Sequence, residues 1–239
     1  MFNNEALFNF VLLIIAYAYV LLVIFVTGKL RKHKLFAPYS RKFLHMMIGN
    51  LVFLIPLFSF NSFPLNFPFF VAAPFILITF LASSFSPLKI ISQKMRALSE
   101  ITDRGHQTGL ICYSLSYTAL AALFSSQPYL IAAGVLPMSY GDAFASIVGQ
   151  KFGKKCYKIF SKKSIEGSIA MFVGTLIFVS ISFMFMTVFS VFPETNILLV
   201  VVAVATIATV AEAVTPLGLD NITVPALSVL VTLAITGGL

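Results

Sequence analysis

Charged residues are scarce in this chain. Asp, Glu, Lys and Arg make up only 10% of its 239 residues, whereas an ordinary soluble domain has about 25%. Hydrophobic residues make up 59%. Because much of a soluble protein's surface must stay polar, one core could not bury so many apolar side chains. The composition therefore excludes a typical soluble enzyme and a disordered protein.

Cysteine is also scarce. The chain has two cysteines, Cys112 and Cys156, and they lie in different contexts without the spacing of metal ligands. The cysteines therefore support neither a disulfide scaffold nor a zinc site, and we expect two ordinary reduced thiols.

Apolar runs fill most of the chain. A membrane-spanning helix needs about 20 apolar residues, and the runs predict an all-α, polytopic membrane protein that forms a single transmembrane domain over 1–239. The first run follows an acidic start and precedes a basic cluster, so we interpret it as an anchor rather than a cleaved signal peptide. The predicted transmembrane helices, about eight in number, cover residues 6–27, 43–60, 66–85, 108–126, 128–149, 168–192, 196–214 and 220–237.

All sixteen basic residues fall in three loops, which follow the first, third and fifth predicted helices. An alternating path puts these loops on one side, which the positive-inside rule makes cytoplasmic, and both termini then face outside. Contact with anionic lipids is a simpler explanation of the charge. No nucleic-acid motif accompanies it, so nucleic acid is not an expected partner. The bases are Lys29, Arg31, Lys32, Lys34, Arg41 and Lys42, then Lys89, Lys94, Arg96 and Arg104, then Lys151, Lys154, Lys155, Lys158, Lys162 and Lys163.

Four acids lie within apolar runs or at their cytoplasmic ends: Asp142, Glu166, Glu212 and Asp220. Carboxylates near hydrocarbon are costly, so they usually pair, bind ions or face a polar cavity. Their position near one membrane face predicts a common site.

The fifth apolar run carries two glycine motifs. Gly141 and Asp142 follow Pro137, which breaks or kinks a helix and lets a carboxylate approach a ligand. The alternative is that Asp142 only caps a local helix end. Gly149 and Gly153 are four residues apart, which suits either close helix packing or backbone approach to a phosphate.

Lys162, Lys163, Ser164, Glu166 and Gly167 open the sixth run. Lysines suit phosphate oxygens, and a serine before a helical run suits a helix N-terminus, where anions are favoured. Anchoring lysines with a helix cap are the alternative.

The turn from Glu212 to Asn221 has no Lys or Arg. Asp220 or Asn221 would cap the last helix, but a cap does not account for Glu212. Carboxylates in a turn that has no lysine or arginine, beside two basic loops, predict a cation site. Oxygen ligands suit Mg²⁺, which also bridges substrate phosphates.

Arg41 or Lys42 shares a helical face with His45, about one turn inside the membrane boundary. His45 is either a structural histidine or a group for proton transfer or phosphate contact. Together, phosphate-seeking bases and cation-seeking carboxylates on one membrane face favour phosphoryl transfer between a nucleotide and a lipid. The chain has neither a Walker A motif nor a kinase glycine-rich loop.

Read in chain order, the motifs resemble those of the polyprenol kinase family, which includes dolichol kinase, phytol kinase and the CTP-dependent diacylglycerol kinase. The resemblance covers residues 41–225 and is most specific from Gly141 to Gly167, whereas 1–40 is a less specific first helix and basic loop. The motifs are Arg41-Lys42-x-x-His45, Gly141-Asp142-Ala143-x-Ala145-x-x-x-Gly149-x-x-x-Gly153-Lys154, Lys162-Lys163-Ser164-x-Glu166-Gly167 and Gly218-Leu219-Asp220-Asn221-x-x-Val224-Pro225.

The central motif also resembles phosphatidate cytidylyltransferase, a related membrane family. That family has a proline before its two lysines, where this chain has Ser161, and its closing turn carries histidine and two aspartates. Here the turn has Asp220 alone and no histidine, so the kinases fit better. The cytidylyltransferase reaction stays an alternative, and so does a lipid transporter or flippase, although the motifs lie at one face and no internal repeat is evident.

The resemblance implies transfer of the γ-phosphate of CTP, with Mg²⁺, to the hydroxyl of an isoprenoid alcohol at the cytoplasmic boundary. ATP is the alternative phosphate donor, and a homodimer is the alternative to a monomer. The implied location is the plasma membrane of a prokaryote or the endoplasmic reticulum of a eukaryote. The expected metal ligands are Asp142, Glu166 and Asp220, with Glu212 as a further candidate. The expected catalytic groups are Asp142, Glu166 and His45, with Asp142 or Glu166 as the base. The expected phosphate-binding residues are Arg41, Lys42, Gly141, Gly149, Gly153, Lys154, Lys162, Lys163, Ser164, Gly167 and Asn221.

Overall fold

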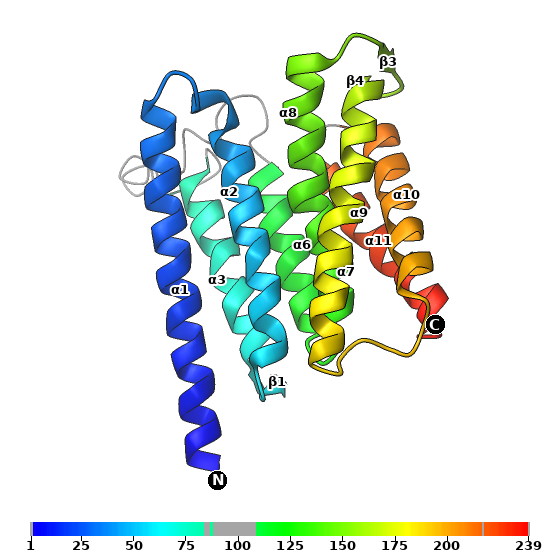
Figure 1. The fold of residues 1–239 in the computed structure, drawn as a ribbon. Helices are drawn as coiled ribbons and strands as arrows, with labels where there is room; N and C mark the ends of the chain where they lie inside the picture. Colours follow the sequence, from blue (N-terminus) through cyan, green and yellow to red (C-terminus); the bar gives the residue numbers. More distant parts are fainter. Residues whose placement is uncertain (1, 84–86, 88–108, 217, 239) are drawn as a thin grey trace. The chain divides into compact units, whose positions relative to one another are not determined.

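A computed structural model describes residues 2–83, 87, 109–216 and 218–238. The second basic loop, with Lys89, Lys94, Arg96 and Arg104, lies outside these residues. The chain forms two compact units, Met1–Ser126 and Gln127–Leu239, called unit 1 and unit 2 here and described separately (Figure 1).

Unit 1 begins with the long helix α1, whose charges suit its ends. Glu5 lies in the first turn, and Lys29, Arg31 and Lys32 lie in the last, where each sign is favoured by the helix dipole. At the start of α3, the Asn66 side chain accepts a hydrogen bond from Phe69 N at 2.9 Å. The elements of unit 1 are α1 (Phe2–Lys32), η1 (Ala37–Tyr39), α2 (Ser40–Gly49), η2 (Asn50–Leu57), β1 (Asn61–Ser62), β2 (Leu65–Asn66), α3 (Phe67–Ala82) and α6 (Gly109–Leu123).

Tyrosine hydroxyls join α1 to its neighbours in unit 1. Tyr17 donates a hydrogen bond to the carbonyl of Phe70 on α3 at 2.6 Å, and Tyr19 donates to the carbonyl of Met47 on α2 at 2.8 Å. Helix α3 in turn packs against α6. These contacts hold α2, α3 and α6 on one side of α1.

Unit 2 begins with α7 (Pro128–Leu136), which continues through a π-helical turn, η3 (Pro137–Gly141), into α8 (Asp142–Phe152). A short hairpin follows, in which β3 (Cys156–Lys158) pairs with β4 (Lys162–Ser164). Three helices complete the unit: α9 (Ile165–Val188), α10 (Ile197–Val214) and α11 (Asp220–Thr236).

Small residues bring the helices of unit 2 together. A methyl group on Gly141 would collide with Thr175 Oγ1, and one on Gly174 would lie 2.7 Å from the Phe144 ring. Helix α9 also packs against α10, and α11 packs against both α10 and α7. Figure 1 shows the hairpin at the end of unit 2 where α8 ends and α9 begins.

The helical prediction is confirmed, because each predicted run contains helix. Within the described residues, four helices are long and apolar enough to cross a membrane: Asn4–Lys32, Pro128–Phe152, Ile165–Val188 and Ile197–Val214. Shorter apolar helices are Phe67–Ala82, Gly109–Leu123 and Asp220–Thr236. The chain is thus all-α and membrane-like. The eight crossings, the outside termini and the single transmembrane domain stay predictions.

Two runs differ in detail from a plain helix. The second run is α-helical only to Gly49 and then becomes a 3₁₀ helix that contains Pro56, which has no N–H to donate to a helical hydrogen bond. The expected interruption at Pro137 takes the form of a π-helical turn within one continuous helix. Such turns occur often at functional sites.

Candidate functional site

The β3–β4 hairpin separates the two lysines of the sixth-run motif. Successive residues of a strand point to opposite faces, so Lys162 and Lys163 diverge. Lys162 is exposed and lies opposite Lys158 on the partner strand, whereas the Lys163 side chain is only 14% exposed. In this structure the two lysine side chains therefore do not lie side by side, and their joint contact with a phosphate stays a prediction.

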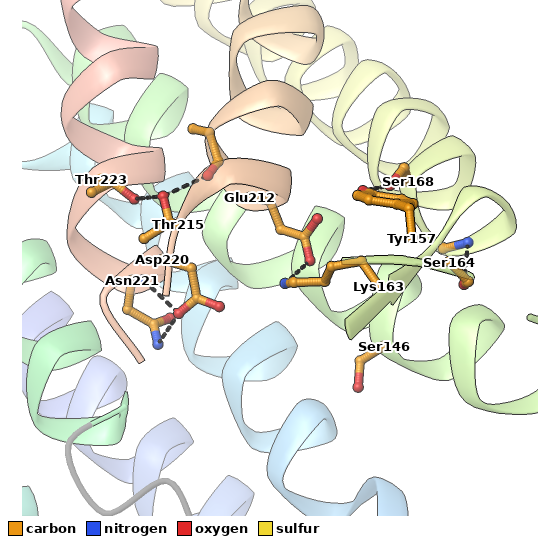
Figure 2. Close-up of polar contacts among 12 residues, drawn as sticks. Ser146, Tyr157, Lys163, Ser164, Ser168, Glu212, Thr215, Asp220, Asn221 and Thr223 are labelled. Atoms are coloured by element: carbon orange, nitrogen blue, oxygen red, sulfur yellow. Dashed lines mark hydrogen bonds and ion pairs between the residues drawn. The ribbon is translucent and has the colours of Figure 1, made fainter. Parts of the chain in front are cut away.

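Lys163 reaches across to helix α10. Its Nζ forms an ion pair with Oε1 of Glu212, whose side chain is 5% exposed near the end of that helix. Figure 2 shows the lysine side chain extending from the hairpin to this carboxylate, with Asp220 and Asn221 nearby on α11. One partly buried ion pair thus links the hairpin to a residue 49 positions later in the chain.

Two more carboxylates lie around this pair. Asp142, at the start of α8, and Asp220, at the start of α11, interact electrostatically with both Lys163 and Glu212. Burial by itself lowers the pKa of Lys163, but the three carboxylates, Glu212 foremost, raise that pKa above its usual value. One ammonium against three carboxylates leaves the cluster with a formal charge of −2. We call Asp142, Lys163, Glu212 and Asp220 the acidic cluster.

The turn between α10 and α11 positions Asp220. Gly218 has a φ of 92°, a conformation that favours glycine, and the chain reverses there. Asp220 is the first residue of α11, and Leu219 precedes it as the N-cap without a side-chain bond. The Asp220 Oδ1 accepts hydrogen bonds from Asn221 N at 3.0 Å and from Asn221 Nδ2 at 3.3 Å. The prediction that Asp220 or Asn221 is the N-cap is therefore wrong, since the chain already turns into the helix at Leu219.

Glu166 occupies a different place. Its Oε1 accepts a hydrogen bond from the backbone N–H of Lys155 at 3.3 Å, next to the exposed start of the hairpin. Ser164 is the N-cap of α9, and its hydroxyl accepts from Gly167 N at 3.1 Å, which confirms the predicted helix start. The structure thus brings together three of the four predicted metal-site carboxylates and sets Glu166 beside the hairpin backbone.

The glycines of the central motif pack α8 against the start of α9. A methyl group on Gly149 would lie 3.1 Å from Ser164 Oγ, and one on Gly167 would lie 3.0 Å from the Ala145 carbonyl. A methyl group on Gly153 would collide with the Gly149 carbonyl and approach Ser164. These contacts give the glycines a packing function, and a backbone contact with phosphate stays a prediction.

No group of three or more His, Cys, Asp and Glu side chains in the described part of the chain is close enough to hold a metal ion by itself. Mg²⁺ seldom needs such a group, because it usually keeps several waters and takes one or two carboxylates plus substrate phosphates. Asp142 and Asp220 supply the hard oxygen donors that this coordination requires. Magnesium binding at the acidic cluster stays a prediction.

Unit 1 carries the remaining predicted residues. Lys42 and His45 are buried on α2, whereas Arg41 is half-buried. The Tyr113 ring lies 4.5 Å from the His45 ring between centroids, and its hydroxyl donates to the His45 carbonyl at 3.1 Å. The participation of these α2 residues in the chemistry of unit 2 stays a prediction.

Sequence reasoning missed the pairing of Lys163 with Glu212 and a second contact of the hairpin. The Tyr157 hydroxyl lies 2.7 Å from Ser168 Oγ on α9. Tyr157 and Lys163 are opposite each other in the register, so both side chains lie on the same face of the hairpin. The sequence signal for a hairpin is the short, lysine-rich segment between two apolar runs. It contains Lys154, Lys155, Lys158 and Lys162, all of which are exposed in the structure.

Comparison with known proteins agrees with the motifs. No family model matches the chain, and no solved structure matches it. A phytol kinase from Synechocystis sp. is 31% identical over 205 residues, which cover 82% of this chain and 78% of the relative. Identity at this level over most of both chains shows common membership. The chain therefore belongs to the polyprenol kinase family, the family of phytol kinases.

Proposed function

We propose that this protein transfers the γ-phosphate of a nucleoside triphosphate to the hydroxyl of an isoprenoid alcohol such as phytol. The relative supports the class of acceptor. The observation that carries the proposal is the acidic cluster, in which Lys163 is held by Glu212 between Asp142 and Asp220. A partly buried lysine among carboxylates, at the end of apolar helices, provides both kinds of charge that phosphoryl transfer requires.

Lys163 is the group that we assign to the triphosphate. Lys163 already donates a charge-assisted hydrogen bond to a carboxylate oxygen of Glu212, which is the kind of bond that a phosphate oxygen would also accept. A lysine ammonium has three donors on a flexible stem, so Lys163 can contact a phosphate without leaving the carboxylates around it. Exposed Lys154 and Lys162 attract the nucleotide to this end of the unit.

Asp142 and Asp220 would hold the magnesium ion. The formal charge of −2 on the acidic cluster matches one divalent cation. When bound, the ion supplies charge neutralisation for the phosphates. Glu212 keeps Lys163 in place and is a positioning residue in this scheme.

The transfer balances as a single displacement. The alcohol oxygen forms a bond to the γ-phosphorus, the bond from that phosphorus to the oxygen bridging to the β-phosphate breaks, and the nucleoside diphosphate leaves with the electron pair. The hydroxyl proton passes to a carboxylate, for which Asp142 and Glu166 are the candidates. Asp142 is the stronger of the two, since it belongs to the same cluster as Lys163. CTP as donor follows from the family resemblance, and ATP is the alternative.

Eight crossings with the hairpin on the cytoplasmic side would place the acidic cluster where a cytoplasmic nucleotide meets a lipid. Lysines at this end and apolar helices behind it support that orientation. The lipid would then enter sideways between helices with its hydroxyl at the boundary.

The test uses the purified full chain with Mg²⁺, phytol and CTP or ATP labelled at the γ-phosphate. Label in the lipid product supports the kinase. A parallel reaction with CTP labelled at the α-phosphate and phosphatidate as the acceptor detects the cytidylyltransferase product, which retains that label while pyrophosphate leaves. Label in lipid from the α-position alone, or in neither reaction, contradicts the proposal.

A further inference from the structure

The β3–β4 hairpin has little stability of its own. Each strand has only three residues, and a two-stranded hairpin by itself is at best marginally stable in water. Lys158 and Lys162 also lie opposite each other, and like charges in that arrangement destabilise a strand pair. The place of Lys163, which lies on β4, therefore depends on contacts between the hairpin and the helices of unit 2.

The register of the two strands decides which of these contacts can form. Tyr157 lies opposite Lys163, so both side chains share one face. From this face Tyr157 contacts Ser168 of α9 (Figure 2). Lys163 extends from it to Glu212 of α10. A shift of one residue between the strands would put Tyr157 and Lys163 on opposite faces, and the two contacts could then not form together.

Glu166 holds the chain where β3 begins. Its Oε1 accepts a hydrogen bond from the N–H of Lys155 at 3.3 Å, and the N–H of Lys154 also stabilises the carboxylate. The carbonyl of Lys155 accepts a hydrogen bond from the N–H of Ile165 at 2.9 Å. Both backbone groups of Lys155 are thus bonded to the first turn of α9. Because Lys155 precedes β3 and Ile165 follows β4, these bonds close the base of the hairpin and fix its register.

The carboxylate of Glu166 is engaged differently from those of the acidic cluster. Asp142 and Asp220 interact with the ammonium group of Lys163, whereas backbone N–H groups contact the carboxylate of Glu166. The second oxygen of Glu166, Oε2, is shielded from solvent. A magnesium ion or a substrate hydroxyl could therefore reach that oxygen only after the turn before β3 had moved.

We infer that Glu166 is a positioning residue, which sets the register of the hairpin and so keeps Lys163 in the acidic cluster. In this role its oxygen only has to accept a hydrogen bond from a backbone N–H. Replacement of the carboxylate by an amide would preserve such an acceptor, but it would impair a magnesium ligand or a base. The inference rests on the proposed function for the task of Lys163, and it leaves Asp142 as the candidate for the base.

Hydrogen exchange of the hairpin amides in the purified full chain tests the positioning role without turnover. Glu166→Gln keeps an acceptor oxygen, whereas Glu166→Met keeps the length of the side chain and removes the acceptor. Exchange across residues 155–164 should be about tenfold faster in Glu166→Met than in wild type, and within about threefold of wild type in Glu166→Gln. Glu194→Met is the control for charge, because Glu194 is exposed between α9 and α10, and it should leave this exchange unchanged. If Glu166→Met does not fold, Glu166→Ala replaces it.

Turnover separates positioning from chemistry. With phytol, Mg²⁺ and saturating nucleotide, Glu166→Met should be about tenfold slower than wild type, because Lys163 spends less time in the acidic cluster. Glu166→Gln should restore turnover to within about threefold of wild type and should need the same Mg²⁺ concentration for half-maximal turnover. Asp142→Asn makes the same chemical change at the acidic cluster, and it should lose turnover while its hairpin exchanges at the wild-type rate.

Three results would overturn the inference. The first is hairpin exchange at the wild-type rate in Glu166→Met. The others are slow turnover or a higher Mg²⁺ requirement in a Glu166→Gln protein whose hairpin exchanges as in wild type, and they would make Glu166 a base or a metal ligand. If wild type shows no turnover, the proposed function fails, and the exchange measurement alone decides whether Glu166 holds the hairpin.

Discussion

Removal of Lys163 from its ion pair with Glu212 should destabilise the protein more than removal of Glu212. Lys163→Met leaves Glu212 buried at 5% exposure beside Asp142 and Asp220, and changes the formal charge of the cluster from −2 to −3. An uncompensated buried charge costs about 3–5 kcal/mol. Glu212→Gln changes the charge to −1 and leaves Lys163 with two carboxylates. The loss is then about 1.5–3 kcal/mol, the value of one hydrogen bond to a charged group.

Thermal unfolding in detergent, followed by circular dichroism of the helices, measures this difference. For a chain of this size, 1 kcal/mol corresponds to about 2–4 °C. The midpoint should fall by about 6–20 °C for Lys163→Met and by about 3–12 °C for Glu212→Gln. Lys158→Met is the matched control, because Lys158 is an exposed lysine of the same hairpin, and it should change stability by no more than about 0.5 kcal/mol.

The double variant Lys163→Met with Glu212→Gln completes a double-mutant cycle. If the two side chains form the pair seen here, the combined loss should be smaller than the sum of the single losses by about 1–3 kcal/mol. Equal losses from the two single variants, a larger loss from Glu212→Gln, or strict additivity would refute this account of the acidic cluster.

Three further predictions concern the same end of unit 2. Ser164→Ala removes the N-cap of α9 and should cost about 1 kcal/mol in thermal unfolding; no change would show that the cap is dispensable. Lys163→Gln should lower turnover at saturating nucleotide by about 100-fold, whereas Lys158→Gln should leave it unchanged, and similar losses in both would indicate a general charge effect. The pKa of Lys163 is raised in the fold, so its stabilisation is complete below the ordinary lysine pKa of about 10.4 and is lost as pH rises through the higher folded value. The difference in unfolding midpoint between wild type and Lys163→Met should therefore stay constant from about pH 7 to 10 and narrow above that; narrowing at neutral pH would contradict the pairing.

The helices of this protein could be predicted from hydropathy because a backbone in lipid must satisfy its hydrogen bonds internally. Each apolar run therefore becomes helix, and Ser164 before the sixth run marks the start of α9. The π-helical turn at Pro137 was foreseen only as an interruption. Proline removes a helical hydrogen bond, but the packing of Gly141 against Thr175 is a tertiary contact that local sequence does not reveal.

The carboxylates of the site could be predicted from their cost in lipid, but not their grouping. Glu212 and Lys163 are separated by 49 positions, and only the packing of α10 beside the hairpin joins them. Their adjacent positions in the sequence suggest that Lys162 and Lys163 act together, but neighbouring residues of strand β4 point to opposite faces. Three residues of strand are too few for an alternating pattern to be visible in the sequence. Its position at the cytoplasmic end of an apolar run groups Glu166 with the other acids, whereas its carboxylate accepts a hydrogen bond from the backbone N–H of Lys155.

The measurement that tests the central claim most directly is the transfer of labelled γ-phosphate to phytol by the purified full chain, compared between wild type and Asp142→Asn. The account predicts a labelled phytyl monophosphate from wild type and a large loss of turnover in the folded variant. Absence of labelled lipid from wild type with both CTP and ATP would contradict the proposed function. Turnover near wild type in Asp142→Asn would contradict the assignment of the acidic cluster as the site of transfer.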